Sequence, residues 1–216
     1  MKLAKVTIKL VCALAAAAAV ALPAHAYFIA LDSTRTTGNQ SWTGPLGMDF
    51  DVLAPIWVTK LGAFDSLANG FSNDINVGIY DRSTGLLVAS ATLNTGNTTA
   101  GGTNNRFFDI ADFMLAAGSY SIVADGYGDA EQNGNMAFGG AGPTANMCGG
   151  LIAFTGAARY GNTDQGLMLP TIIDTGPSNR YDAGTFEYKA VPEPGSIALA
   201  GIGLFGLGLI RRRKRA

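Results

Sequence analysis

Histidine and cysteine are nearly absent from this 216-residue chain, which has one His and two Cys. His25 and Cys12 fall in an N-terminal segment that we expect to be removed, so the remaining chain has no histidine and only Cys148. Without histidine there is no Ser-His-Asp triad, no Cys-His pair and no histidine-ligated zinc. One cysteine forms no intramolecular disulfide, and Cys148 is predicted to be a small buried hydrophobic residue or, alternatively, an exposed thiol that joins two chains.

Positive charge is also scarce between residues 27 and 190, where 7 Lys and Arg stand against 15 Asp and Glu, a net charge of −8. The whole-chain net charge of −1 hides this asymmetry because the cations are concentrated near the two ends. Contacts to nucleic-acid phosphates need clustered cations, so the composition excludes nucleic acid as a partner. An acidic domain of this kind is better suited to divalent cations.

The N-terminus has the pattern of a secretory signal peptide. Three lysines, the last of them Lys9, precede an apolar run from Leu10 to Leu22, and the small-x-small sequence Ala24-His25-Ala26 follows. We therefore predict a signal peptide over residues 1–26, cleaved by signal peptidase after Ala26. The run of 13 residues is short of the roughly 20 that span a bilayer, which argues against the alternative of a retained N-terminal anchor.

The C-terminal segment, residues 191–216, combines three features. Val191-Pro192-Glu193-Pro194 precedes an apolar stretch from Gly195 to Ile210, and a basic tail over residues 211–215 follows. We predict a single transmembrane helix over about 195–210 with its basic tail in the cytoplasm, because cations flanking an apolar segment stay on that side. The prolines fix φ and oppose helix continuation, so the Pro-Glu-Pro stretch is predicted to be extended and accessible to a protease.

These three features, in this order, resemble the PEP-CTERM sorting signal of Gram-negative bacteria over about 25 residues. The resemblance implies recognition by an exosortase, a membrane cysteine protease, after secretion across the inner membrane. It also implies transient anchoring with a cytoplasmic C-terminus, followed by residence at the cell surface or in the extracellular matrix. The sorting residues would be Val191, Pro192, Glu193, Pro194, Arg211, Arg212 and Arg213. The alternative is an ordinary single-pass tail with an incidental Pro-Glu-Pro.

Residues 27–190 are predicted to form one all-β domain, a β-sandwich. Short apolar runs alternate with Gly-, Asn-, Ser- and Thr-rich stretches, and period-two alternation predicts strands with one buried face. The predicted strands are 56–64, 75–80, 86–93, 106–110, 119–124, 151–155 and 185–189, with exposed loops over 94–105 and 125–143. The segments Leu61–Asp65, Val77–Asp81 and Leu115–Tyr120 resemble a jelly-roll-like sandwich common in PEP-CTERM proteins.

One loop carries a pattern close to that of a calcium site. Asp129, Glu131 and Asn133 alternate before Gly134, and Asp125 lies just upstream. An EF-hand is excluded because Gly140 stands where its bidentate Glu would be. The sequence therefore predicts either a looser calcium loop or a solvated acidic loop, and no other cofactor.

Four aromatic residues flanked by loop-type residues are candidates for stacking on sugar rings: Trp42, Tyr127, Tyr160 and Tyr181. Sugar binding needs exposed aromatic faces beside polar groups, and partial burial is the alternative for each residue. Trp57 lies in a predicted strand beside Ile56 and Val58, so it is predicted to belong to the core.

These features favour a non-enzymatic surface or matrix protein without catalytic residues, associated with exopolysaccharide or biofilm and binding glycan. One alternative is a secreted hydrolase acting on polysaccharide, which needs two carboxylates at a fixed separation, and no pattern selects such a pair. The other is a structural coat protein without a ligand.

Overall fold

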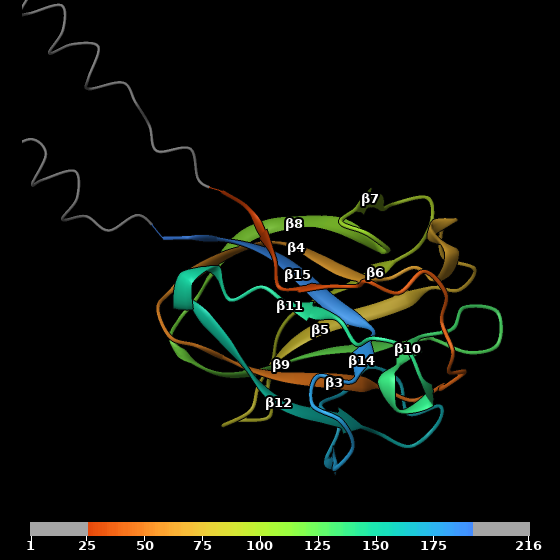
Figure 1. Cartoon of the computed structure of the whole chain (residues 1–216). Helices are drawn as coiled ribbons and strands as arrows, with labels where there is room; N and C mark the ends of the chain where they lie inside the picture. Colours follow the sequence, from red (N-terminus) through yellow and green to blue (C-terminus); the bar gives the residue numbers. More distant parts are fainter. Residues whose placement is uncertain (1–25, 192–216) are drawn as a thin grey trace, which may run out of the picture.

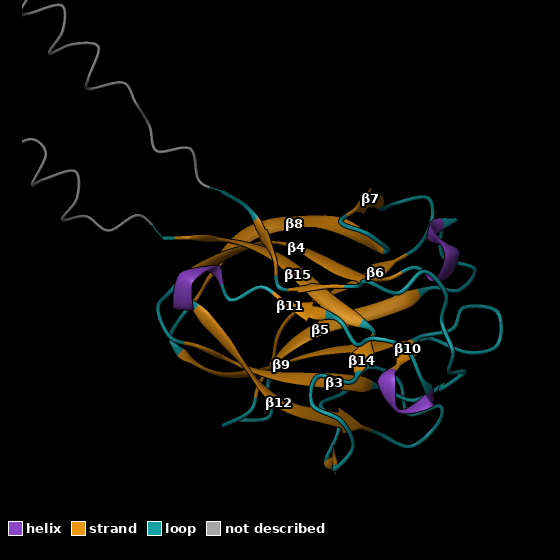
Figure 2. Cartoon of the chain, viewed as in Figure 1, coloured by secondary structure: helices purple, strands orange, loops and turns teal. Residues whose placement is uncertain are grey.

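The computed structural model describes residues 26–191, which form a β-sandwich with only short 3-10 helices besides strands (Figures 1 and 2). The predicted signal peptide up to residue 25, Pro192-Glu193-Pro194, the predicted transmembrane helix and the basic tail lie outside the described residues. Within 26–191, no helix is long and apolar enough to cross a membrane.

Two antiparallel sheets make up the domain. The first has the order β1 (Phe28–Ile29), β15 (Gly184–Ala190), β4 (Ile56–Phe64), β8 (Asn105–Leu115) and β7 (Thr99–Gly101). The second has the order β13 (Ile172–Asp174), β12 (Ile152–Tyr160), β3 (Leu46–Val52), β9 (Gly118–Asp125), β5 (Ile75–Asp81) and β6 (Leu87–Leu93). The chain passes repeatedly from one sheet to the other, as in a β-sandwich.

Small elements complete the fold. Two two-stranded sheets pair β10 (Gly134–Asn135) with β14 (Tyr181–Asp182), and β11 (Thr144–Ala145) with β2 (Leu31–Asp32). The 3-10 helices are η1 (Ser66–Ala68), η2 (Met136–Phe138) and η3 (Cys148–Gly150).

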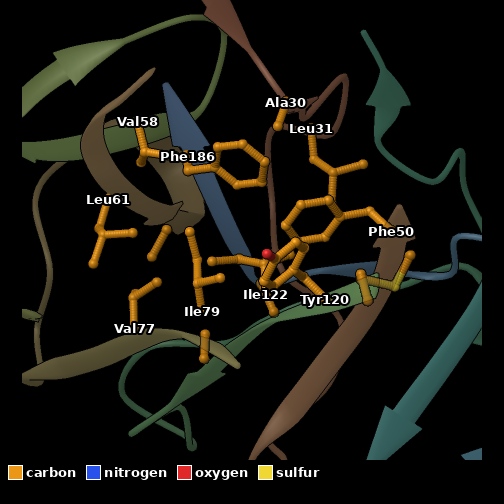
Figure 3. Packing of buried hydrophobic residues seen from close by; sticks show 14 of the residues in the cluster. Ala30, Leu31, Phe50, Val58, Leu61, Val77, Ile79, Tyr120, Ile122 and Phe186 are labelled. Atoms are coloured by element: carbon orange, nitrogen blue, oxygen red, sulfur yellow. The ribbon is translucent and has the colours of Figure 1, made fainter. Parts of the chain in front are cut away.

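The hydrophobic core lies between the two large sheets (Figure 3). Val58, Leu61 and Phe186 of the first sheet face Phe50 and Ile122 of the second, and all five are fully buried. Among the described residues, the core cluster is drawn from residues 30–188.

The outer face of the second sheet is covered around β9, which corrects the prediction that β9 buries only one face. Ser121 and Val123, on the face predicted to be exposed, are as inaccessible as Ile122. The segment after β12 folds back over this face, where Arg159 Nη1 donates to the Pro170 carbonyl. A strand in the middle of a covered sheet loses the alternation that marks a half-exposed one.

Trp57 is not in the core cluster, since alternation along β4 directs Ile56 and Val58 inward and leaves Trp57 partly exposed, paired with Met114. Its assignment to the core was wrong. Cys148 is partly buried against the core at a positive φ of 42°.

Both ends of the described chain leave the sandwich together (Figure 1). β1 pairs antiparallel with β15 so that Phe28 lies opposite Tyr188, and the Lys189 ammonium lies 5.4 Å from the centre of the Tyr27 ring. We call this end, with Tyr27 and Ala190, the terminal end. β12 runs from it, where Ile152 pairs with Val52, to the opposite end, where Tyr160 pairs with Leu46.

Candidate functional site

A hollow of about 190 Å³ lies at the end of the sandwich opposite the terminal end, and we call it the end pocket. Its lining residues are Gln40, Trp42, Tyr160, Asp174, Arg180 and Tyr181. They come from four places in the sequence: the segment before β3, the last residue of β12, the last residue of β13, and the entry to β14. Three of the four aromatic residues proposed from the sequence as sugar platforms are therefore brought together.

The aromatic walls of the end pocket are set at right angles. The rings of Trp42 and Tyr160 have their centroids 6.0 Å apart with an interplanar angle of 85°, an edge-to-face contact. The Arg180 guanidinium carbon lies 5.1 Å from the centre of the Tyr181 ring, within cation–π range. Trp42 and Tyr160 stay partly exposed, whereas Tyr181 is buried. Trp42 and Tyr160 therefore offer the aromatic surface that a ligand could contact.

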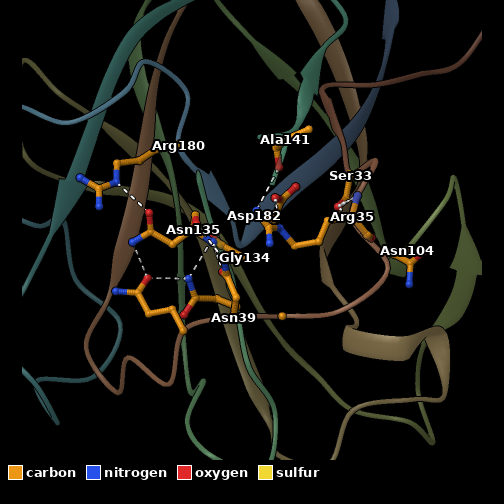
Figure 4. A network of polar contacts seen from close by, with 12 residues as sticks. Ser33, Arg35, Asn39, Asn104, Gly134, Asn135, Ala141, Arg180 and Asp182 are labelled. Carbon is orange, nitrogen blue, oxygen red and sulfur yellow. Dashed lines mark hydrogen bonds and ion pairs between the residues drawn. The ribbon is translucent and has the colours of Figure 1, made fainter. Parts of the chain in front are cut away.

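A continuous hydrogen-bond network holds the polar side of the end pocket, and Figure 4 shows the part of it that joins Asn135 to Arg180. Asn135 Nδ2 donates to Gln40 Oε1 at 2.9 Å, and Arg180 Nε donates to Asn135 Oδ1 at 3.0 Å. Arg180 Nη1 also donates to Asp174 Oδ1, and the Tyr181 hydroxyl donates to Asp174 Oδ2 at 2.5 Å. A connected network fixes the positions of its side chains more firmly than isolated pairs do.

The network sets the ionisation of two of its members. Partial burial would raise the pKa of the Asp174 carboxyl. The hydrogen bonds from Tyr181 and from the Gly176 N–H, with the charge of Arg180, outweigh burial and bring that pKa below its ordinary value. Burial, followed by the bond to Asp174, raises the pKa of Tyr181 well above its ordinary value. At neutral pH, Asp174 is therefore a carboxylate and Tyr181 a neutral donor.

One donor in the end pocket has no partner. The indole Nε1–H of Trp42 is buried and meets no acceptor among residues 26–191. Buried donors without an acceptor are rare in folded proteins because losing the hydrogen bond to water is costly.

Tyr127 does not belong to this site, which corrects its selection as a sugar platform. Its side chain is only 2% exposed, and its hydroxyl lies within hydrogen-bond distance of the carbonyl oxygens of Phe64 and Ala183. Burial raises the pKa of Tyr127 well above its ordinary value. Tyr127 is thus a core residue that joins the two sheets.

The residues predicted to ligate calcium do not converge. The segment 125–143, predicted to be an exposed loop, is largely buried up to residue 135 and is exposed over residues 137–141. Glu131 is buried, and its two carboxylate oxygens accept from the backbone N–H groups of Ser66 and Ser72 at 2.9 and 3.0 Å. Asn133 is fully buried and donates to Gln40, whereas Asp129 is exposed.

Among the described residues, no three acidic, cysteine or histidine side chains are grouped so that they could hold a metal ion. Asp125 is buried with one carboxylate oxygen unpartnered, and burial raises its pKa. The alternating pattern of this segment therefore serves to bind backbone N–H groups and neighbouring amides, not to assemble the predicted calcium loop.

Sequence reasoning missed the polar residues of the end pocket: Gln40, Asn135, Asp174 and Arg180. A usable signal existed for Arg180, because a cation is rare in this domain and Arg180 directly precedes a candidate aromatic residue. Nothing comparable marks Gln40 or Asn135, whose roles depend on contacts between segments 95 positions apart.

Comparison with known proteins identifies the C-terminal segment. The PEP-CTERM protein-sorting motif matches residues 190–214, and no curated protein matches the chain. The chain thus carries a PEP-CTERM sorting motif, which implies an exported protein that is sorted by an exosortase and anchored at its C-terminus before cleavage. Of the predicted sorting residues, Val191 lies at the end of the described region, one position after β15.

Proposed function

We propose that this chain is a surface or matrix protein of a Gram-negative bacterium whose β-sandwich binds a neutral saccharide unit of exopolysaccharide or biofilm at the end pocket. The convergence of Trp42, Tyr160 and Tyr181 on one hollow carries the proposal. The sorting motif supports the extracellular setting, because it implies export and exosortase processing. The signal peptidase step after Ala26 and the cytoplasmic position of the basic tail are parts of the same proposal.

The chemistry of the end pocket suits a sugar ring. Saccharide recognition combines an apolar aromatic face with polar groups that fix orientation, and the partly exposed rings of Trp42 and Tyr160 stand beside Gln40 and Arg180. Among the described residues, Arg180 donates hydrogen bonds through Nε and Nη1 only. Its Nη2 therefore remains a donor for a bound sugar. A volume of about 190 Å³ is smaller than the pockets of about 300 Å³ and more that take drug-sized ligands, which favours a single ring.

Charge balance favours a neutral sugar over an acidic one. Arg180 is the only cation among the described residues lining the end pocket, and its charge is already compensated by Asp174. An added carboxylate would meet a negative side chain held ionised by its lowered pKa. No cofactor is needed for binding of this kind.

Binding is favoured over hydrolysis. Glycoside hydrolysis needs two carboxyl groups, one of them protonated at the working pH to act as general acid. Asp174 is the single acid among the described residues that line the end pocket, and its lowered pKa makes it a poor proton donor. We therefore propose that the domain has no catalytic activity toward the saccharide.

A glycan array with the exported, mature protein tests the proposal. The wild type is expected to retain one class of neutral saccharide, and Trp42→Ala to lose it because the aromatic wall is removed. Trp57→Ala is the matched control, since Trp57 is a partly exposed tryptophan on the outer face of the first sheet. Binding that survives Trp42→Ala, or absence of binding to any saccharide, overturns the proposal, and the latter outcome favours the structural coat protein.

A further inference from the structure

Large apolar side chains are exposed at the terminal end of the sandwich, and they come from five separate segments. Tyr27 precedes β1, Leu53 lies in the turn between β3 and β4, and Leu86 closes the β5–β6 hairpin; Met114 is near the end of β8, and Met147 precedes η3. Their exposed fractions run from 49% for Met147 to 67% for Leu86. Single exposed apolar residues are common on proteins, so their placement is what needs explaining.

Strand register places these residues at the same end. Leu53 N–H donates to the Leu151 carbonyl, and Leu151 N–H donates to the Met147 carbonyl, which joins two of the segments. In the first sheet, Met114 pairs with Trp57, and Trp57 pairs on its other side with Lys189. In the second sheet, the β5–β6 hairpin is joined to the start of β9, because Arg82 N–H donates to the Ser119 carbonyl.

The chain itself brings this end close to a bilayer. β15 ends at Ala190, and the apolar stretch of the sorting segment begins at Gly195. The five residue-to-residue steps from Ala190 to Gly195 span at most about 18 Å when fully extended. Because the sorting motif implies anchoring at the C-terminus before cleavage, the terminal end is held within that distance of the membrane.

We propose that the terminal end is a membrane-contacting surface, whose apolar residues Leu53, Leu86, Met114 and Met147 enter the headgroup region of the lipid bilayer while the chain is anchored. The contact holds the domain with its end pocket directed away from the membrane. The surface is independent of saccharide binding, because none of its residues lines the end pocket.

The contact is apolar and not electrostatic. The two cations nearest this end are already paired, Arg82 with Asp49 and Asp51, and Lys189 with Asp112. Attraction to anionic lipids needs several uncompensated cations, and the domain as a whole is acidic. A lipid surface is favoured over a second copy of the chain as the partner of this end. The short connection keeps the end of every anchored molecule next to the membrane.

The experiment uses the mature chain, residues 27–216, with Cys148→Ser and one introduced cysteine carrying an environment-sensitive fluorophore. Leu53→Cys and Leu86→Cys report on the terminal end. Leu67→Cys and Phe138→Cys are the matched controls, because these residues are 62% and 64% exposed but lie at the pocket end, in η1 after β4 and in η2 after β10. The protein is reconstituted through its C-terminal segment in phosphatidylcholine vesicles with and without a lipid-borne quencher.

At positions 53 and 86 we expect a blue shift of the fluorophore emission and quenching by the lipid-borne quencher. Added salt should change neither effect. At positions 67 and 138 we expect neither effect. Equal quenching at both ends, or no quenching at 53 and 86, overturns the proposal. A blue shift that appears without quenching and grows with protein density indicates contact between copies, which also overturns it. Two positions are labelled at this end, so that a fluorophore that disturbs one loop does not decide the result alone.

Discussion

The ring of Phe50 on β3 lies 5.0 Å, centroid to centroid, from the ring of Phe186 on β15, at an interplanar angle of 37°. The two strands belong to different sheets, so this contact joins the layers at the centre of the core (Figure 3). Both side chains are fully buried, and Phe186 also contacts the ring of Tyr188, with centroids 5.7 Å apart. β15 is thereby fixed to the second sheet just before the sorting segment begins.

Phe186→Ala is expected to destabilise the domain by about 3–5 kcal/mol, because it removes a large buried ring and leaves a cavity. The free energy of unfolding in urea measures the loss. Phe138→Ala, at a residue 64% exposed, serves as control and should change stability by no more than about 0.5 kcal/mol. In a double-mutant cycle, coupling between Phe50 and Phe186 should be about 0.5–1.5 kcal/mol, and near-zero coupling would contradict the contact.

Glu131 and Asp129 are two residues apart, yet their substitutions should differ sharply. Glu131→Ala leaves the N–H groups of Ser66 and Ser72 without acceptors, and we expect a loss of about 2–5 kcal/mol in the free energy of unfolding. Asp129→Ala changes an exposed side chain and should be close to neutral. A calcium loop would instead make both substitutions abolish a calcium-dependent rise in melting temperature, and we expect no such rise in the wild type.

The fold was largely predictable from the sequence, whereas the polar part of the site was not. The strands predicted over residues 75–80 and 86–93 are confirmed as β5 and β6, which pair with each other. β3 was not predicted, because an acidic residue such as Asp49 is typical of an exposed loop. Asp49 is in fact buried, with Arg159 Nε 2.8 Å from its carboxylate oxygens.

Long-range partners explain the other failures. Nothing local to Glu131 distinguishes a calcium ligand from a residue that binds the backbone of a loop about 60 positions away. The sequence separated exposed from buried loop aromatic residues only in part. Tyr127 is followed by glycine, as an exposed turn residue often is, yet its buried hydroxyl lies within hydrogen-bond distance of the carbonyl oxygens of Phe64 in β4 and of Ala183 just before β15. The sequence indicated candidate site residues, but the packing of the folded chain determines which of them lie together.

Asp125→Asn should stabilise the domain at neutral pH. Burial raises the pKa of Asp125 and one oxygen lacks a partner, so a neutral amide avoids the cost of keeping a charge there. With the folded pKa above the unfolded one, wild-type stability falls as pH rises between the two values. The advantage of the amide variant should therefore appear only above about pH 4 in thermal unfolding curves. If Asp125→Asn were more stable than wild type by the same amount down to about pH 3, ionisation of Asp125 would not be the cause.

Asp174→Asn should have the opposite pH dependence. The lowered folded pKa means that Asp174 stabilises the domain above its unfolded pKa, and that this contribution disappears as pH falls through the folded value. The variant should be less stable than wild type at pH 7, with the difference shrinking in acid. Tyr181→Phe removes one donor to this carboxylate and should cost about 1.5–3 kcal/mol at pH 7 by urea unfolding. A neutral result for both variants would mean that the network does not hold the end pocket.

The C-terminus of the processed protein should lie after Ala190. β15 supplies Phe186 and Tyr188 to the core and pairs along its whole length with β4, so a cut within the strand would remove buried rings and backbone hydrogen bonds. A protease needs an extended, accessible segment, and Val191 is the first residue beyond the strand. Intact-mass spectrometry of the exported protein should therefore give an N-terminus at Tyr27 and a C-terminus between 191 and 216. A C-terminus between 184 and 189 would show that sorting acts on a domain that is not yet folded, because the folded sandwich withholds that strand.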